Sequence, residues 1–173
     1  MVGRTPEFMG HKVEAREVKI AAIVTILSAF LIKTGTAFAA YMFVHHPDAA
    51  WAVKPSAWLN NPGYHGFSEM LYEYTSSNAN NGSGFEGLGD NNIFWNVTTG
   101  IVLILGRFIP IIGPIAIVGL LANKKFIPES PGTLRTDSFT FGVMTMAVIV
   151  IVNARSFFPA LTLGPIAEYF SLK

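Results

Sequence analysis

One polar run has the composition of a cation-binding turn, and its residues are Ser77-Asn78-Ala79-Asn80-Asn81-Gly82-Ser83-Gly84. The run fits neither a helix nor a strand, whereas residues 68–76 before it fit two to three helical turns with Ser68 as the N-cap. The C-terminal end of a short helix is negative and attracts a cation. Glycines after it allow backbone carbonyls to turn toward the ion and replace its water shell. The pattern favours a re-entrant pore loop if membrane spans flank it, although an Asn/Gly-rich surface loop would look similar.

Apart from this possible cation-binding run, the sequence shows no pattern typical of a catalytic site. The sequence contains no nucleotide-binding loop, no paired catalytic carboxylates and no Ser/His/Asp arrangement. Cysteine is absent, which excludes disulfides and thiolate metal sites. His45-His46-Pro47-Asp48 has metal-ligand side chains but lacks other ligands nearby. The net charge is only +1, so no basic field points to a nucleic-acid partner.

The composition predicts an integral membrane protein with the lipid bilayer as a partner. The chain has 173 residues, of which 51% are hydrophobic and only 13% are charged. A soluble domain carries about 25% charged residues. So few charged side chains cannot cover a globule of this size with polar surface, so the apolar excess must face something other than water, and lipid is the obvious candidate.

Three apolar stretches reach the roughly 20 residues needed to cross a bilayer: Ile20–Val44, Ile93–Ala122 and Phe139–Phe158. The second is too long for one upright span and contains glycines and prolines, so we predict a tilted helix that kinks near residues 106–114. The aromatic residues near the span ends are predicted to form belts at the membrane interface. These are Tyr41, Trp51, Trp58, Tyr64 and Trp95.

The distribution of Lys and Arg predicts the orientation of these spans, because cytoplasmic loops carry an excess of both. Lys and Arg gather in residues 1–19 and in the 123–138 loop, whereas the other side carries only Lys54 and Lys173. Residues 1–19 and 123–138 are therefore predicted to be cytoplasmic. The 45–92 connection and the C-terminal tail then face outward.

Several charged residues have both a functional and an ordinary interpretation. Arg107 lies within an apolar span, where an ionisable side chain costs about 2.5–3.5 kcal/mol or more, so it either tunes an ion site or pairs with backbone carbonyls between helices. Glu69, Glu73, Glu86 and Asp90 would make the outer mouth acidic and concentrate cations. They would equally keep a loop soluble, and Glu69 could be a carboxylate in the first turn of the short helix.

Longer strings along the chain are more specific. They are Val2-Gly3-Arg4-Thr5-Pro6-Glu7-Phe8, then NPGYHGFSEMLY over residues 61–72, Thr75-Ser76, Asn80-Asn81-Gly82-Ser83, Gly106-Arg107-Phe108, and LGPIAEY over residues 163–169. In this order they resemble the C-terminal part of the potassium-binding A subunit of the bacterial Kdp potassium pump. The resemblance covers residues 2 to about 170.

The resemblance implies an all-α integral membrane fold that is similar to a potassium channel. In that family four membrane–pore–membrane units of one polypeptide surround one selectivity filter. Residues 20–122 would be the fourth unit, with a pore loop at about 61–90, and residues 139–173 would be the final transmembrane helix and an outer tail. Residues 1–19 and 123–138 remain the cytoplasmic segments, so the resemblance and the charge distribution agree.

The same resemblance implies a site and partners. The potassium filter would consist of Asn80, Asn81, Gly82, Ser83 and Gly84, and the pore-associated residues would be Glu69, Thr75, Ser76 and Arg107. Potassium is then the transported ion, and the chain itself has no catalytic site. A partner P-type ATPase subunit hydrolyses ATP, small subunits complete the complex, and the N-terminal part of the same subunit supplies the other units. The expected location is the bacterial plasma membrane.

The chain departs from the family pattern next to the filter. The family string usually reads NNNGSAF, whereas Ala79 and Gly84 replace an Asn and an Ala here, around an intact Asn80–Ser83 core. Two alternatives therefore stay open: a non-transporting remnant or assembly-type membrane protein, and a self-assembled homotetrameric channel. The chain is expected to be a split-gene product, a truncated frame or a fragment of the longer subunit.

Overall fold

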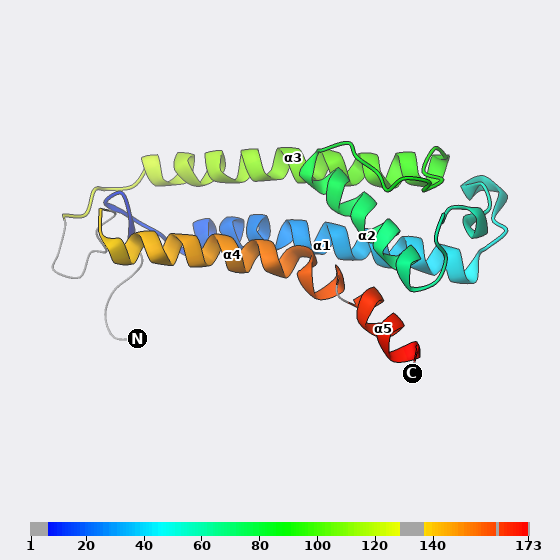
Figure 1. Cartoon of the computed structure of the whole chain (residues 1–173). Helices are drawn as coiled ribbons and strands as arrows, with labels where there is room; N and C mark the ends of the chain where they lie inside the picture. The colour runs from blue at the N-terminus through cyan, green and yellow to red at the C-terminus, as the bar shows by residue number, and fades with distance from the viewer. Residues whose placement is uncertain (1–6, 129–136, 162, 173) are drawn as a thin grey trace. The chain divides into compact units, whose positions relative to one another are not determined.

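The computed structural model describes residues 7–128, 137–161 and 163–172, with the backbone alone for 155–161, 163 and 164 (Figure 1). The described chain is mainly helical. Its helices are α1 (Ala15–His45), α2 (Tyr64–Ala79), α3 (Ile93–Ala122), α4 (Phe139–Leu161) and α5 (Leu163–Ser171), with two short 3₁₀ turns at Ala50–Ala52 and Pro55–Ala57. The chain divides into two compact units, one within residues 1–26 and 109–152, the other within 27–108 and 153–173.

The two longest helices coincide with predicted spans. α3 has the predicted bounds, and α1 begins five residues before the predicted span and ends one residue after it. Both are long and apolar enough to cross a membrane by length and composition. Pro110 and Pro114 lie inside α3, which runs as one helix past them. α4 contains the third predicted span, but its apolar stretch over described side chains, 139–154, is shorter, so the third crossing stays a prediction.

Helix α2 begins and ends at other residues than the sequence predicted. Gly63, with φ of 98°, precedes its first residue, so the Asn-Pro-Gly turn starts the helix and the prediction of Ser68 as N-cap is wrong. Residues 77–79, predicted as part of the turn, are helical. The helix stops because Asn80 is left-handed, with φ of 60°. The amides of Asn80 and Asn81 then donate to the carbonyls of Ser77 and Ser76, at 3.1 and 3.0 Å, the bond pair of a Schellman motif.

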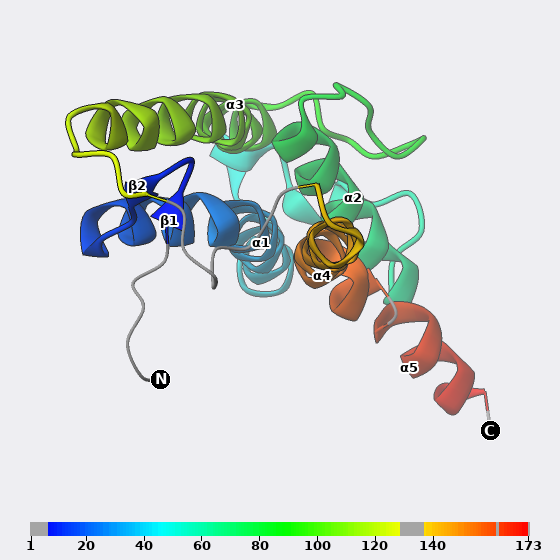
Figure 2. The ribbon, with the colours of Figure 1, turned by 90° about the vertical axis from the view of Figure 1, so that its left-hand side faces the viewer.

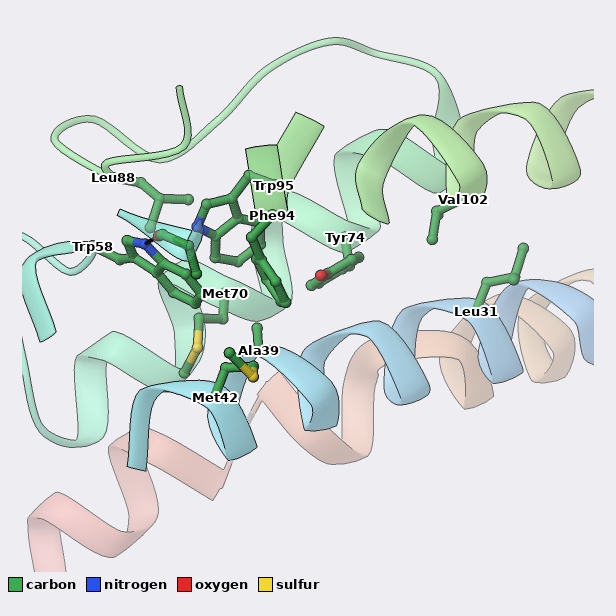
Figure 3. Packing of buried hydrophobic residues seen from close by; sticks show 11 residues of the cluster. Leu31, Ala39, Met42, Trp58, Met70, Tyr74, Leu88, Phe94, Trp95 and Val102 are labelled. Carbon is green, nitrogen blue, oxygen red and sulfur yellow. Dashed lines mark hydrogen bonds between the residues drawn. The ribbon is translucent and has the colours of Figure 1, made fainter. Parts of the chain in front are cut away.

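Buried aromatic rings hold the second unit together (Figure 3). Trp58 and Trp95 are each 1% exposed, and the Trp58 ring stacks on Phe94 with centroids 4.6 Å apart. The Trp58 indole N–H donates to the carbonyl of Ala52 at 2.9 Å. The prediction of a belt at the membrane interface is therefore wrong for these two tryptophans, because both are buried in a core that α1, α2, α3 and the 45–92 segment share. Trp51, by contrast, is 55% exposed.

Tyr74 joins three helices within this unit. Its side chain is fully buried, and its hydroxyl donates to Thr98 Oγ1 of α3 at 2.9 Å. Its ring lies against Gly35 of α1, where a β-carbon would be only 2.4 Å from Cδ1 of the ring. A residue without a side chain is thus needed at 35 for the two helices to approach. On the other flank of α2, His65 pairs with Glu168 of α5 at 2.8 Å.

The first unit contains a small hairpin that the sequence did not predict (Figure 2). Strand β1 (Glu7–Phe8) pairs antiparallel with β2 (His11–Lys12) through Met9 and Gly10, which both have positive φ. The two-residue connection with positive φ at both positions is the turn that suits strand twist. The carbonyl of Gly10 accepts the amide of Ile127 at 2.6 Å, so the hairpin also holds the segment after α3.

Lys124 also connects the segment after α3 to the segment before α1. The amine of Lys124 lies 2.9 Å from the carboxylate of Glu17 and 3.2 Å from that of Glu14, and it donates to the carbonyl of Lys12 at 3.0 Å. Burial alone would lower the pKa of the Lys124 amine, but its hydrogen bonds to Glu17 and Glu14 raise it above the ordinary value. The segments before α1 and after α3 are therefore held together.

The contact at Gly35 leads to a prediction. Gly35→Ala should lower the free energy of unfolding by about 1–3 kcal/mol, because the new methyl group overpacks against Tyr74. Gly100→Ala in α3 is the matched control: nothing lies within 4 Å of the new β-carbon, and alanine favours a helix over glycine by about 1 kcal/mol. Thermal unfolding in detergent measures both. A Gly35→Ala variant as stable as the parent would show that α1 and α2 do not pack through this face.

Candidate functional site

The predicted ion loop follows α2 directly, and residues 81–84 are all exposed in this chain. Gly82 has φ of 69°, and nothing lies within 4 Å of the position a β-carbon would take. Glycine is therefore required there by backbone shape and not by crowding.

Ser76 attaches this loop to α2. Its hydroxyl accepts the amide of Ser83 at 2.9 Å and pairs with the Ser83 hydroxyl at 2.8 Å. The hydroxyl of Tyr72 also lies 3.2 Å from Ser83 Oγ. Thr75, predicted beside the pore, instead donates to the carbonyl of Leu71 in its own helix at 2.7 Å. Of the adjacent residues Thr75 and Ser76, only Ser76 therefore contacts the loop through its hydroxyl.

Arg107 attaches the start of the loop to α3. Its Nε donates to Oδ1 of Asn80 at 2.7 Å, and the Asn80 amide group donates to the carbonyls of Asn78 and Leu103, at 3.2 and 3.4 Å. Gly106 allows α3 to lie close to the end of α2, because a β-carbon at 106 would lie only 2.7 Å from the carbonyl oxygen of Asn78. A positive charge thus lies at the C-terminal end of α2, where the helix dipole favours it. Asn80 therefore uses its side chain as a tether.

Glu69 lies away from the loop, against the turn that precedes α2. Its side chain is 1% exposed, and its two carboxylate oxygens accept the amides of Asn60 and Asn61, at 3.0 and 2.8 Å. It belongs to the second turn of α2, so the prediction of a first-turn carboxylate is wrong. The carboxylate holds the 60–61 backbone in place.

Glu73 is the residue whose environment the sequence analysis missed. It was grouped with exposed acidic residues, yet its side chain is only 9% exposed, whereas Glu86 is exposed. One oxygen accepts the Ser77 hydroxyl at 3.5 Å, and the other, Oε2, has no hydrogen-bond partner among the described residues. Burial raises the pKa of the Glu73 carboxyl, and the nearby Asp90 raises it further. The sequence offered only the spacing of four residues between Glu69 and Glu73, which places both on one helix face.

Known proteins match this chain along nearly its whole length. A family model described as the potassium-transporting ATPase A subunit matches residues 1–170. A relative from Flavobacterium johnsoniae is 70% identical over all of this chain, and one from Phocaeicola vulgatus is 70% identical over 99% of it. A relative from Geobacillus kaustophilus is 47% identical over all of it. Each is named a potassium-transporting ATPase potassium-binding subunit, and the chain spans about 30% of the length of these curated relatives.

The different contacts of the Ser76 and Thr75 hydroxyls can be tested. Ser76→Ala removes two hydrogen bonds to Ser83, each worth about 0.5–1.5 kcal/mol, so amide exchange at Ser83 should become roughly tenfold faster. Thr75→Val removes only a bond within α2 and should leave that exchange unchanged. Hydrogen–deuterium exchange of peptides covering residues 80–86 measures both variants. Equal exchange in Ser76→Ala and the parent would contradict the tether.

Proposed function

The chain belongs to the family of potassium-transporting ATPase A subunits, and on that premise we propose that it forms one quarter of a potassium-selective filter. The loop of residues 80–84 is the filter segment, α2 is the pore helix, and α1 and α3 are the flanking membrane helices. The observation that carries this proposal is the left-handed glycine at 82, in a loop that directly follows a short helix between two apolar helices. This is the element order of a membrane–pore–membrane unit.

Backbone carbonyls of the loop are the proposed potassium ligands. A potassium ion loses its hydration shell in a filter, so carbonyl oxygens must surround it on all sides. Positive φ at Gly82 sets the direction of the neighbouring peptide groups. Ser76 and Arg107 hold the two ends of the loop, so the carbonyls keep their positions without an ion present. Preorganised ligands of this kind reduce the cost of ordering the loop around the ion.

Arg107 has the proposed role of a positioning residue. Its hydrogen bond to Asn80 fixes the residue that ends α2, and its charge partly offsets the negative end of that helix. The offset weakens the attraction between the pore helix and a cation in the filter. An ion that is held less tightly can leave toward the next site, as transport requires.

The remaining filter segments and the energy source are proposed to lie outside this chain. One loop supplies only one side of an ion cage, and the rest of the subunit, about 70% of the length of the relatives, would supply three more. ATP hydrolysis would belong to a P-type partner subunit, with small subunits completing the complex. α4 would be the last crossing, and the complex would lie in the bacterial plasma membrane.

The filter proposal predicts different effects for two neighbouring substitutions. Gly82→Ala should weaken potassium affinity roughly tenfold and reduce discrimination against other cations, because a left-handed alanine costs about 1–2 kcal/mol. Ala79→Asn should have a much smaller effect, because Ala79 is exposed at the last residue of α2. Uptake of potassium and rubidium by the complete subunit with its partner subunits, in a strain lacking its own pump, measures both.

Two results would contradict the filter proposal. The first is a Gly82→Ala variant whose affinity and selectivity match those of the parent. The second is selective potassium uptake by this chain alone at a concentration where it is monomeric, because a single loop cannot complete the cage. Selective uptake by this chain as a tetramer would favour the homotetrameric channel instead.

The proposed topology has its own test, which the absence of natural cysteine makes simple. Lys125→Cys follows α3 and Ala50→Cys lies between α1 and α2, and both positions are exposed. If residues 1–19 and 123–138 are cytoplasmic, a membrane-impermeant thiol reagent added to intact cells should label only the cysteine at 50. Labelling at 125 without labelling at 50 would reverse the proposed orientation.

A further inference from the structure

Helix α5 meets the pore helix α2 at its first turn. Nε2 of His65, the second residue of α2, lies 2.8 Å from Oε2 of Glu168 in α5. Both helices belong to the same compact unit, although most of the chain separates them in sequence. Figure 1 shows α5 beside the start of α2. The last described helix is thus in contact with the helix that carries the loop.

Glu168 is the only charged residue in the sequence of α5. The exposed large side chains of this helix are mainly apolar, and they include Ile166 and Phe170. A carboxylate in such a helix is stabilised by a hydrogen-bond donor, and His65 supplies one. The Glu168 side chain is 37% exposed, so the pair contributes little to the free energy of unfolding. What the contact can set is the position of α2 relative to α5.

His65 also borders a groove that reaches the far end of the loop. The groove has a volume of about 260 Å³, and its lining residues are Asn61, His65, Ser68, Glu69 and Phe85. Phe85 directly follows Gly84, and its ring meets that of Tyr72 edge-on with the centroids 5.5 Å apart. The first turn of α2 and the residue after the loop therefore share one groove, and a shift of that turn changes the surroundings of both.

We propose that Glu168 is a positioning residue for the potassium filter, and that it acts through His65 on the first turn of the pore helix. This role rests on the proposed filter. Binding groups must be held within about 0.5 Å of their working positions by the residues that support them. The loop begins where α2 ends, so a small displacement of this helix is enough to misplace the carbonyl groups.

The contact does not require a charged histidine. The bond needs a hydrogen on Nε2, and both the imidazolium and one neutral tautomer of histidine carry it. Glu168→Gln keeps an oxygen that accepts this bond, whereas Glu168→Ala removes the acceptor. Comparing the two variants therefore separates the loss of the contact from the loss of the negative charge.

A contact that only stabilises the fold is the competing explanation, and uptake kinetics distinguish the two. Loss of a merely structural contact reduces the amount of assembled pump, which lowers the maximal rate of uptake and leaves the KM for potassium unchanged. Loss of a positioning contact changes the filter of every assembled pump, so it raises the KM for potassium.

The test uses the complete subunit assembled with its partner subunits, with potassium and rubidium uptake measured over a range of concentrations. Glu168→Ala should raise the KM for potassium roughly threefold, and Glu168→Gln should restore most of the loss. His65→Ala should reproduce the effect of Glu168→Ala. The two alanine effects should not add in the double variant, because either one removes the same contact. Glu86→Ala, which removes an exposed carboxylate elsewhere in the unit, is the matched control for charge.

A second readout does not depend on transport. Hydrogen–deuterium exchange of peptides covering residues 64–72 should be faster in Glu168→Ala than in the parent, and Glu168→Gln should match the parent. A parent complex that transports no potassium would contradict the proposed function and with it the role in the filter, while the exchange would still show whether Glu168 holds the helix. With an active parent, the proposal is wrong if Glu168→Ala leaves the KM unchanged or if Glu168→Gln is as impaired as Glu168→Ala.

Discussion

The geometry of the site depends on where helix α2 ends. The left-handed conformation of Asn80 directs the amides of Asn80 and Asn81 back to the carbonyls of Ser77 and Ser76. These bonds satisfy two carbonyls that a helix end would otherwise leave unpaired, and they turn the chain away from the helix axis. One more helical residue would move Gly82 out of the turn. The contacts of the loop with Ser76 and with Arg107 can form only if the helix stops at Asn80.

Glycine serves two separate purposes around this helix. At 35 and 106 the residue is small because another element lies close, the ring of Tyr74 in one case and the carbonyl of Asn78 in the other. At 82 the space is open and the backbone conformation alone requires glycine. The first kind of glycine sets how tightly α2 packs between its neighbours, and the second sets the shape of the loop. Together they place a loop of defined shape on a closely packed helix.

The sequence predicted the parts of the fold that depend on composition over long windows. The bounds of α3 followed from a long apolar run that only Arg107 interrupts with a charge, and the existence of α2 and its loop followed from the change to Asn, Gly and Ser. The start of α2 could not be predicted reliably, because Gly63 and Ser68 are both acceptable residues before a helix. The burial of Trp58 and the partners of Glu69 depend on contacts between segments that local pattern does not encode. The role of Asn80 as a tether to α3 was hidden for the same reason.

The hairpin before α1 and the lysine after α3 have a consequence for the order of biosynthesis. Lys124 donates to a carbonyl 112 residues earlier in the chain, and Ile127 donates to the turn of the hairpin. These partners cannot meet until the ribosome has completed both long helices and the whole segment between them. Contacts between such distant residues form late, after the loop that they close has been ordered. Until then Glu14 and Glu17 lack Lys124, the lysine that contacts both, so the contacts of this segment are complete only after α3 has been made.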